Sequence, residues 1–443
     1  MNTPIIDFLK DYSGSGTLRA HMPGHKGISP SEDIPDALFI HDITEIPGAD
    51  SLFEANGIIA ESEKNMSRLY GTYATVYSAA GSTLCIQAML YLMKCERRKV
   101  FAVRNVHRAF LNAAALTGID TEWIMPDYSG GLLSGEINTK TVEEKLSRCS
   151  VPACLYVTSP DYTGKTADIR TLSEICRRYG ARLIVDNAHG AHLAFLTPNI
   201  HPITLGADLC CDSAHKMLPA LTGAAMLHSG RDFTAEQLKQ AMSLFASTSP
   251  SYLILASLDL CTDYIDRFIK EDIRSNTNDI LRLKEHFSDR LLFAESEPFH
   301  ITVKASASGI DGIVLAENLR RNGVECEYTD CDITILLMSA MNCPDDYVRL
   351  TSAFESAYEQ CGRIPPYDEA FSLTLPPKAM GIRDAVFAPN ETIPVESALG
   401  RICGAVKVPC PPAVPIAASG EIITAECINI FKKYRISEVN VVK

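Results

Sequence analysis

The sequence predicts an α/β protein built around a mainly parallel β-sheet. Between about residues 70 and 230, short apolar runs rich in β-branched residues alternate with stretches of helical periodicity. The hydrophobic fraction of 46% and the charged fraction of 21% are those of an ordinary globular chain, and 443 residues suffice for two or three domains. Apolar strands separated by helices are typical of a sheet that is buried on both faces.

The expected elements follow one another in a regular order. The strands are predicted at residues 73–77, 100–103, 153–158, 182–185, 208–211 and 224–227. The helices between them are predicted at residues 83–93, 108–116 and 169–179. In such sheets the ligand binds beyond the carboxyl ends of the strands. The turns that should carry function are therefore residues 78–83, 104–107, 158–164, 186–192 and 212–216.

The character of the chain changes after about residue 270. A long charged helix is expected at residues 274–289, followed by short strands and helices and a proline-rich tract at 363–366. We expect residues 1–50 to form an N-terminal arm and residues 51–270 a large domain. Residues 271–443 are expected to form a smaller α+β C-terminal domain.

Composition excludes several classes of partner. Lys plus Arg is 41 and Asp plus Glu is 54, so the formal net charge is −13. That balance disfavours nucleic acid and anionic membranes, and favours small molecules or other proteins as partners. No apolar run approaches the roughly 20 residues of a membrane-spanning helix, and the N-terminus lacks the features of a signal peptide. The 15 cysteines are scattered, many in apolar runs, which predicts free thiols in a cytoplasmic protein.

Several motifs that resemble known sites lack an essential part. Gly164-Lys165-Thr166 resembles the end of a P-loop, but Ser159 stands where that motif needs glycine. We find no Gly-x-Gly-x-x-Gly motif after a strand and no Gly-x-Ser-x-Gly motif. The histidine pairs at 189/192 and 21/25 come without a recognisable set of further ligands, so we assign no metal.

Three turn motifs together indicate a pyridoxal phosphate site. Asp186 ends a predicted buried strand, and Lys216 follows another strand among the apolar residues Ala214, Met217 and Leu218. A desolvated lysine has a lowered pKa suited to imine formation. Residues 81–83 (Gly-Ser-Thr) lie at a strand-to-helix turn, where backbone N–H groups and hydroxyls can bind a phosphate. A lysine, a carboxylate for the pyridine nitrogen and a phosphate site are what this cofactor requires.

Residues 17–27 (TLRAHMPGHKG) resemble the N-terminal signature of the ornithine/lysine/arginine decarboxylases of PLP fold type I. Further motifs follow in the family's order at residues 42–45 (DITE), 104–108 (RNVHR), 158–164 (TSPDYTG), 186–192 (DNAHGAH) and 213–216 (SAHK). Weaker similarity to the family's C-terminal domain appears at residues 400–402, 411–415 and 420–421. The chain resembles the short form, without the N-terminal wing domain of longer members.

The resemblance implies roles for the matching residues. Lys216 would be the Schiff-base lysine, Asp186 the partner of the pyridine nitrogen, and His107 and Ala188 the residues packed on the two faces of the ring. His189 would lie near the phenolic oxygen or the substrate carboxylate. The residues expected around the phosphate are Gly81, Ser82, Thr83, Ser213 and His215. The family pattern is altered at Asn187, where glutamate is common, at 221–223, and at 410–415 and Ser419.

The resemblance also implies a reaction, the decarboxylation of lysine, arginine or ornithine within polyamine biosynthesis. Candidate carboxylates for the distal cation of the substrate are Glu421, Glu45 and Asp50. Two alternatives remain open: another fold-type-I reaction, such as that of an aminotransferase using Arg383 or Arg401, and an inactive relative with a binding role. Because fold-type-I sites are generally completed by a neighbouring subunit, we expect a homodimer or a higher homo-oligomer.

Overall fold

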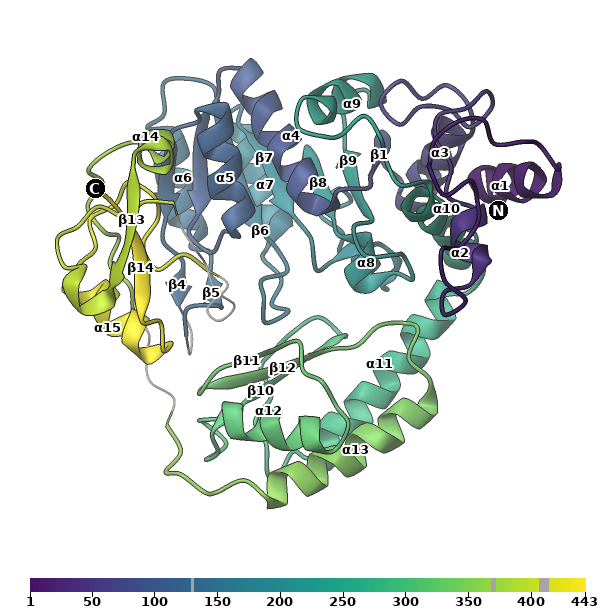
Figure 1. Ribbon diagram of the computed structural model, residues 1–443. Coiled ribbons are helices and arrows are strands. Elements are labelled where there is room, and N and C mark those ends of the chain that lie inside the picture. The colour runs from purple at the N-terminus through teal and green to yellow at the C-terminus, as the bar shows by residue number, and fades with distance from the viewer. Residues whose placement is uncertain (129–130, 368–371, 406–413) are drawn as a thin grey trace. The chain divides into compact units, whose positions relative to one another are not determined.

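The computed structural model describes residues 1–128, 131–367, 372–405 and 414–443 (Figure 1). The chain forms two compact units, each made of two stretches of sequence. Unit 1 comprises Met1–Leu92 and Ile184–Asp272, and unit 2 comprises Met93–Leu183 and Ile273–Lys443.

The strands of unit 1 place the predicted turns at one edge of its sheet. Their order is β1 (Ala74–Ser78), β9 (Ala225–Ser229), β8 (Leu209–Asp212) and the end of β7 (Arg182–Asp186). β7 and β8 are parallel, with Asp186 opposite Cys211, whereas β9 is antiparallel to both β8 and β1. Every residue of β1, β8 and β9 is buried. The chain therefore leaves β7 and β8 in the same direction, immediately before the two turns that carry Asp186 and Lys216.

The helices of unit 1 include three that lie side by side in Figure 1: α1 (Pro4–Gly14), α3 (Ile58–Tyr70) and α10 (Tyr252–Arg267). The carboxylate of Asp259, in α10, accepts hydrogen bonds from the N–H groups of Ile5 and Ile6 at 2.9 and 3.0 Å. The start of α1, where backbone N–H groups have no partner within the helix, is thereby satisfied by a buried side chain. Further helical elements of unit 1 are α2 (Asp36–Ile40), most of α4 (Gly81–Cys95), α8 (Ala214–Met217), α9 (Ala235–Ser243) and a 3₁₀ helix at Ala191–Phe195.

Unit 2 contains a parallel sheet of β6 (Ala153–Thr158), β2 (Lys99–Val103) and β3 (Thr121–Ile124). Its helices α5 (Arg108–Thr117), α6 (Thr139–Ser147) and α7 (Ile169–Arg178) alternate with these strands along the chain. The N-cap residue of α7 is Asp168, whose side chain accepts from the Thr171 N–H at 3.1 Å. A short hairpin of β4 (Asp127–Tyr128) and β5 (Gly135–Glu136) precedes α6.

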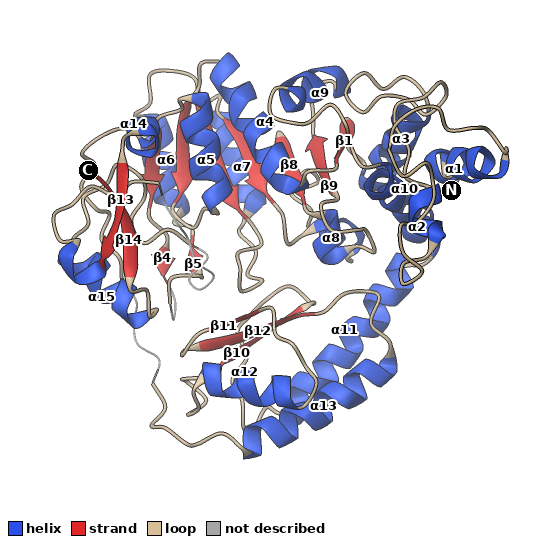
Figure 2. Ribbon diagram, viewed as in Figure 1, coloured by secondary structure: helices blue, strands red, loops and turns tan. Residues whose placement is uncertain are grey.

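The rest of unit 2 holds two antiparallel sheets (Figure 2). One has the order β10 (His300–Lys304), β12 (Ile333–Leu337), β11 (Tyr328–Thr329), with α12 (Gly312–Arg321) packed against it and α13 (Pro344–Glu359) packed on α12. The other pairs β13 (Asn390–Pro394) with β14 (Glu438–Val442). The nearby elements are α14 (Ile382–Phe387), a 3₁₀ helix at Val395–Ser397 and α15 (Ala425–Lys433).

The predicted fold class is confirmed. Each of the six predicted strands is present, with ends within two residues of those expected, as are α4 (Gly81–Cys95), α5 and α7. Two details were wrong. The strand β3 was not expected, because its four residues include the charged Glu122, and α11 (Ile269–His286) begins before Arg274. Among the described residues, no helix combines the length and the apolar character needed to cross a membrane.

Candidate active site

Lys216 lies in the short helix α8, directly after β8. Its helix neighbours Ala214 and Met217 are buried, and the lysine itself is half-buried. The Lys216 Nζ lies 2.8 Å from Nε2 of His189. Two nitrogen atoms at that distance share a proton, because two lone pairs facing each other would repel. The Lys216 amine is therefore hydrogen-bonded to an imidazole that can accept or donate a proton.

Asp186 is the last residue of β7 and is only 2% exposed. Its Oδ1 accepts from the Ala188 N–H at 3.2 Å and lies 3.7 Å from the Cys211 thiol. Burial raises the pKa of Cys211 well above its usual value, so the thiol keeps its proton and can donate it in a hydrogen bond. A carboxylate in such a poorly hydrated place is suited to hold a cationic N–H.

The start of α4 offers an anion site. The Ser213 hydroxyl donates to Ser82 Oγ at 2.9 Å, so two hydroxyls from different turns converge at the N-terminus of a 15-residue helix. Gly81 has φ +71°, which favours glycine, and its N–H donates to the carbonyl oxygen of Gly223 at 2.8 Å. Thr83 is exposed in the first turn, and His215 is held by the carbonyl oxygen of Ala224. Helix N-termini of this kind bind phosphate.

These groups fit pyridoxal phosphate by their chemistry. Within unit 1, one amine, one buried carboxylate and one anion-binding helix end stand on three neighbouring turns. The half-buried Ala188 follows the carboxylate with a side chain small enough to leave room for a flat ring.

Comparison with known proteins decides the family. Residues 3–305 match the family model described as "Orn/Lys/Arg decarboxylase, major domain". The chain belongs to this family. It is 28% identical to an arginine decarboxylase of Bacillus anthracis, over 97% of this chain and 92% of that protein. It is 26% identical to an arginine decarboxylase of Bacillus subtilis, over 97% and 93% of the two chains.

The fold agrees with this assignment. The structure of lysine decarboxylase A from Pseudomonas aeruginosa is similar with a TM-score of 0.82 and 18% identity, over 99% of this chain and 80% of that one. The protein is thus an amino acid decarboxylase, a lyase of the fold-type-I class, and its family implies pyridoxal phosphate as the cofactor.

The remaining predicted site residue of the decarboxylase, His107, lies in unit 2. It is exposed and forms the N-cap of α5, where its Nδ1 accepts from the Ala109 N–H at 3.2 Å. The structure thus gives His107 a local capping role that the sequence did not indicate.

The carboxylates considered for the distal cation of the substrate all have other partners in the decarboxylase. Glu421 forms a buried ion pair with Arg104. Asp50 accepts from backbone N–H groups that include those of Asn56 and Gly57; although burial opposes its ionisation, these bonds hold the pKa of Asp50 below its usual value. Glu45 accepts from the Ser51 hydroxyl at 2.7 Å.

The arginines considered for an aminotransferase reaction are also engaged. Arg383 donates to the carbonyl oxygens of Ala115 and Leu116 at 2.8 and 3.0 Å. Arg401 donates to Glu391 at 2.7 Å and to the carbonyl oxygen of Val442 at 2.8 Å. Of the altered C-terminal motif, residues 410–413 lie outside the described part of the chain.

The sequence analysis missed a buried polar cluster beside β8. His228, a histidine within the apolar strand β9, was a signal for this cluster. His201, Cys210 and Asp212 present possible metal ligand atoms within 4.8 Å of one another. However, the Ile203 N–H donates to His201 Nδ1 at 3.4 Å, so the ring proton resides on Nε2, the atom that faces Asp212. We therefore describe this cluster as hydrogen-bonded and assign it no metal.

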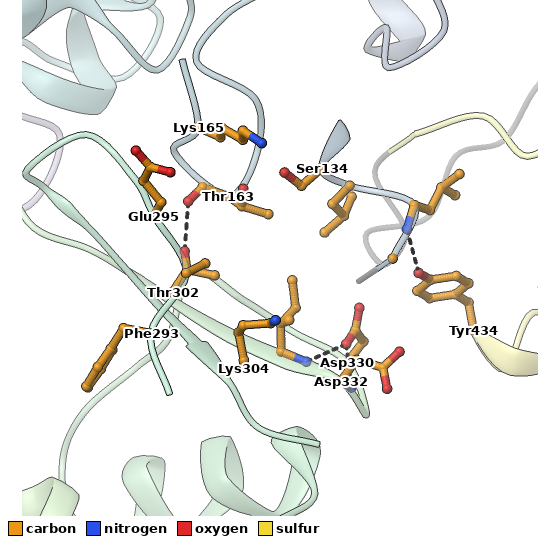
Figure 3. A pocket seen from close by; sticks show the side chains of 15 residues that line it. Ser134, Thr163, Lys165, Phe293, Glu295, Thr302, Lys304, Asp330, Asp332 and Tyr434 are labelled. Atoms are coloured by element: carbon orange, nitrogen blue, oxygen red, sulfur yellow. Dashed lines mark hydrogen bonds between the residues drawn. The ribbon is translucent and has the colours of Figure 1, made fainter. Parts of the chain in front are cut away.

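Two cavities of about 320 Å³ each lie in unit 2. Two carboxylates that line the first have partners. Asp330 accepts from the N–H groups of Asp332 and Ile333 (Figure 3). Asp332 pairs with Lys433 at 2.9 Å. The second is lined by residues of the predicted turns 104–107 and 158–164. The buried oxygens Asn105 Oδ1 and Thr158 Oγ1 there have no hydrogen-bond partner among the described residues, as expected where water or a ligand binds.

Proposed function

We propose that this enzyme decarboxylates a basic amino acid, with arginine as the first candidate. The observation that carries the proposal is the contact of 2.8 Å between Lys216 Nζ and His189 Nε2, on turns next to the buried Asp186, in a chain of this family. The choice of arginine is supported by the relatives named arginine decarboxylase, which align with more than nine-tenths of both chains.

We assign the site residues the roles that their positions favour. Lys216 binds the cofactor covalently, and Asp186 holds the proton of the pyridine nitrogen. Ser82, Thr83 and Ser213, with the N–H groups of the first turn of α4, bind the phosphate. The family resemblance assigns His215 to the phosphate, and His107 and Ala188 to the faces of the ring.

Pyridoxal phosphate, when bound, supplies an aldehyde that bonds to amines and a ring that accepts the electron pair left by departing CO2. The reaction replaces the carboxylate by hydrogen, so it consumes one proton. Lys216 Nζ and His189 Nε2 already share a proton, and Nζ is the group placed to deliver it to the substrate α-carbon.

The product decides between this reaction and an alternative reaction on the same cofactor. Arginine, lysine and ornithine labelled with ¹³C at the carboxylate would be supplied with pyridoxal phosphate, and ¹³CO2 and amine followed by mass spectrometry. We expect ¹³CO2 and the matching amine in equal amounts, most rapidly from arginine. A keto acid without ¹³CO2 would contradict the proposal and indicate an aminotransferase.

A matched pair of variants controls this assay. Lys216→Ala should lose the reaction, whereas Lys64→Ala, at an exposed position of α3, should keep it. We further propose that the enzyme is a cytoplasmic homodimer or higher homo-oligomer that acts in polyamine biosynthesis. The free cysteines support the compartment, and sedimentation of the purified enzyme would test the assembly.

A further inference from the structure

The turn that carries Asp186 and His189 rests on a buried polar cluster. Asp212, its central member, is the last residue of β8 and is 0% exposed. Its Oδ1 accepts from Asn187 Nδ2 at 2.7 Å. His201 Nε2 lies 3.2 Å from its Oδ2, and His228 Nε2 lies 3.3 Å from the same oxygen. Although burial opposes its ionisation, the two imidazoles hold the pKa of Asp212 well below its usual range.

Asn187 connects Asp212 to the turn through hydrogen bonds. Its N–H donates to the carbonyl oxygen of Cys211 at 2.9 Å, and its carbonyl oxygen accepts from the Gly190 N–H at 2.7 Å. Its side-chain amide packs directly on the α-carbon of Gly190, where a Cβ would lie 2.0 Å from Asn187 Oδ1. The turn from Asn187 to Gly190 is therefore closed around this amide, and His189 lies within the turn.

Tyr70 holds the far side of the same turn. Its hydroxyl donates to the carbonyl oxygen of Ala191 at 2.8 Å. Its ring stacks on His228, with a centroid distance of 4.7 Å, and meets His201 edge-on at 5.3 Å. One aromatic ring thus contacts both histidines that flank Asp212 and the backbone that follows Gly190.

We propose that Asp212 is a positioning residue for the catalytic pair: through Asn187 it fixes the turn that holds His189 Nε2 against Lys216 Nζ. The inference rests on the proposed function in taking Lys216 as the cofactor lysine. Because Asn187 links the cluster to the turn of His189, the effect of the cluster should appear as a change in the environment of Lys216 Nζ.

The test uses variants that leave the charge unchanged. Asn187→Leu removes the donor to Asp212 and keeps a similar volume. Asn276→Leu is the matched control in unit 2, since Asn276 is also buried and donates to the carbonyl oxygen of Ala340. The readout is the pH midpoint of the visible absorption of the cofactor bound to Lys216 in the holoenzyme, which reports the protonation of that nitrogen.

We expect Asn187→Leu to shift this midpoint by about one pH unit, a tenfold change in proton affinity, whereas Asn276→Leu leaves it unchanged. The double variant Asn187→Asp with Asp212→Asn keeps the total charge and exchanges the amide donor and the carboxylate acceptor between the two positions. Its midpoint should return at least halfway to the wild-type value. A folded Asn187→Leu enzyme with the wild-type midpoint would overturn the proposal. If Asn187→Leu does not fold, Asn187→Ala decides, since it removes the same donor to Asp212 with a smaller side chain and no change of charge.

The inference and the proposed function fail in different ways. If the wild-type enzyme releases no CO2 from any basic amino acid, the proposed reaction is wrong, yet the midpoint of the bound cofactor can still be measured. If the enzyme decarboxylates arginine while all cluster variants keep the wild-type midpoint, only the role of Asp212 is wrong.

Discussion

Arg104 and Glu421 form a bidentate ion pair within unit 2, with side chains that are 0% and 3% exposed. The Nη1–Oε1 and Nη2–Oε2 distances are 3.1 and 2.7 Å. Nη2 also donates to the carbonyl oxygen of Ile416 at 3.2 Å, and Glu421 Oε2 accepts from the Ala418 N–H at 2.7 Å. The guanidinium lies 4.8 Å from the ring centroid of Trp123. The pair thereby joins the turn after β2 to residues 416–421, which gives Glu421 a structural role.

Breaking this pair from one side should be costly. Glu421→Ala leaves the Arg104 cation buried without its counter-ion, which we expect to lower the free energy of unfolding by about 3–5 kcal/mol. Replacing both residues, as Arg104→Met with Glu421→Leu, removes both charges and should cost less than the single change. Urea denaturation of both proteins measures the difference. If Glu421→Ala were within about 1 kcal/mol of wild type, the pair would have no anchoring role.

The carboxylate of Asp186 should control rate more than stability. In Asp186→Asn the side chain no longer carries the charge that holds a cationic ring nitrogen, so we expect kcat to fall by about 10²–10³. The variant should fold and bind cofactor, since the amide oxygen can still accept from the Ala188 N–H. Asp168→Asn, at the N-cap of α7, is a control that should leave kcat unchanged. An Asp186→Asn enzyme with a tenth of wild-type kcat would argue against the assigned partner.

The hydroxyls at the start of α4 should affect cofactor affinity. Ser82→Ala and Ser213→Ala each remove one hydrogen-bonding group, which we expect to raise the Kd for pyridoxal phosphate about 2- to 12-fold. Because the two hydroxyls bond to each other, the double variant should lose less than the sum of the single losses. Fluorescence titration of the cofactor-free enzyme measures these values, with the exposed Ser243→Ala as the control. Equal affinities in the wild-type enzyme, both single variants and the double variant would exclude this phosphate site.

Asp259 should make stability depend on pH. Burial raises the pKa of this carboxyl from 3.8 to about 6, so between these values the folded protein binds more protons than the unfolded chain. The stabilisation is then complete below pH 3.8 and is lost as the pH rises through 6, by roughly 3 kcal/mol. Asp259→Asn keeps an acceptor for Ile5 and Ile6 and should remove this decline. Urea denaturation at pH 4 to 8 tests it, and identical curves for the two proteins would contradict the assignment.

The sequence was sufficient for the strands and for the position of Lys216 because both depend on local pattern. Apolar runs such as 153–158 can be buried on both faces of a sheet, and a lysine directly after such a strand lies at the ligand-binding edge. The contact between Lys216 and His189 also follows from adjacency, since their turns leave parallel neighbouring strands. The separate compact units, by contrast, combine distant stretches of chain that no local pattern links.

Side-chain contacts between residues that are far apart in the sequence could not be predicted. Glu421 was a candidate for the substrate cation, whereas the structure pairs it with Arg104, which is 317 positions away. The same holds for His201 and His228, which acquire a role only once β8 and β9 are paired and Asp212 lies between them. The substitution at Asn187 becomes interpretable for the same reason: a carboxylate there would face the carboxylate of Asp212.

The most direct test of the site is the identity of the lysine that carries the cofactor. The holoenzyme would be reduced with borohydride, which fixes the cofactor on its lysine, and then digested and mapped by mass spectrometry. We predict one reduced pyridoxyl group per chain, on Lys216. Modification of a different lysine, such as Lys165 or Lys304, with Lys216 unmodified, would contradict the site described here.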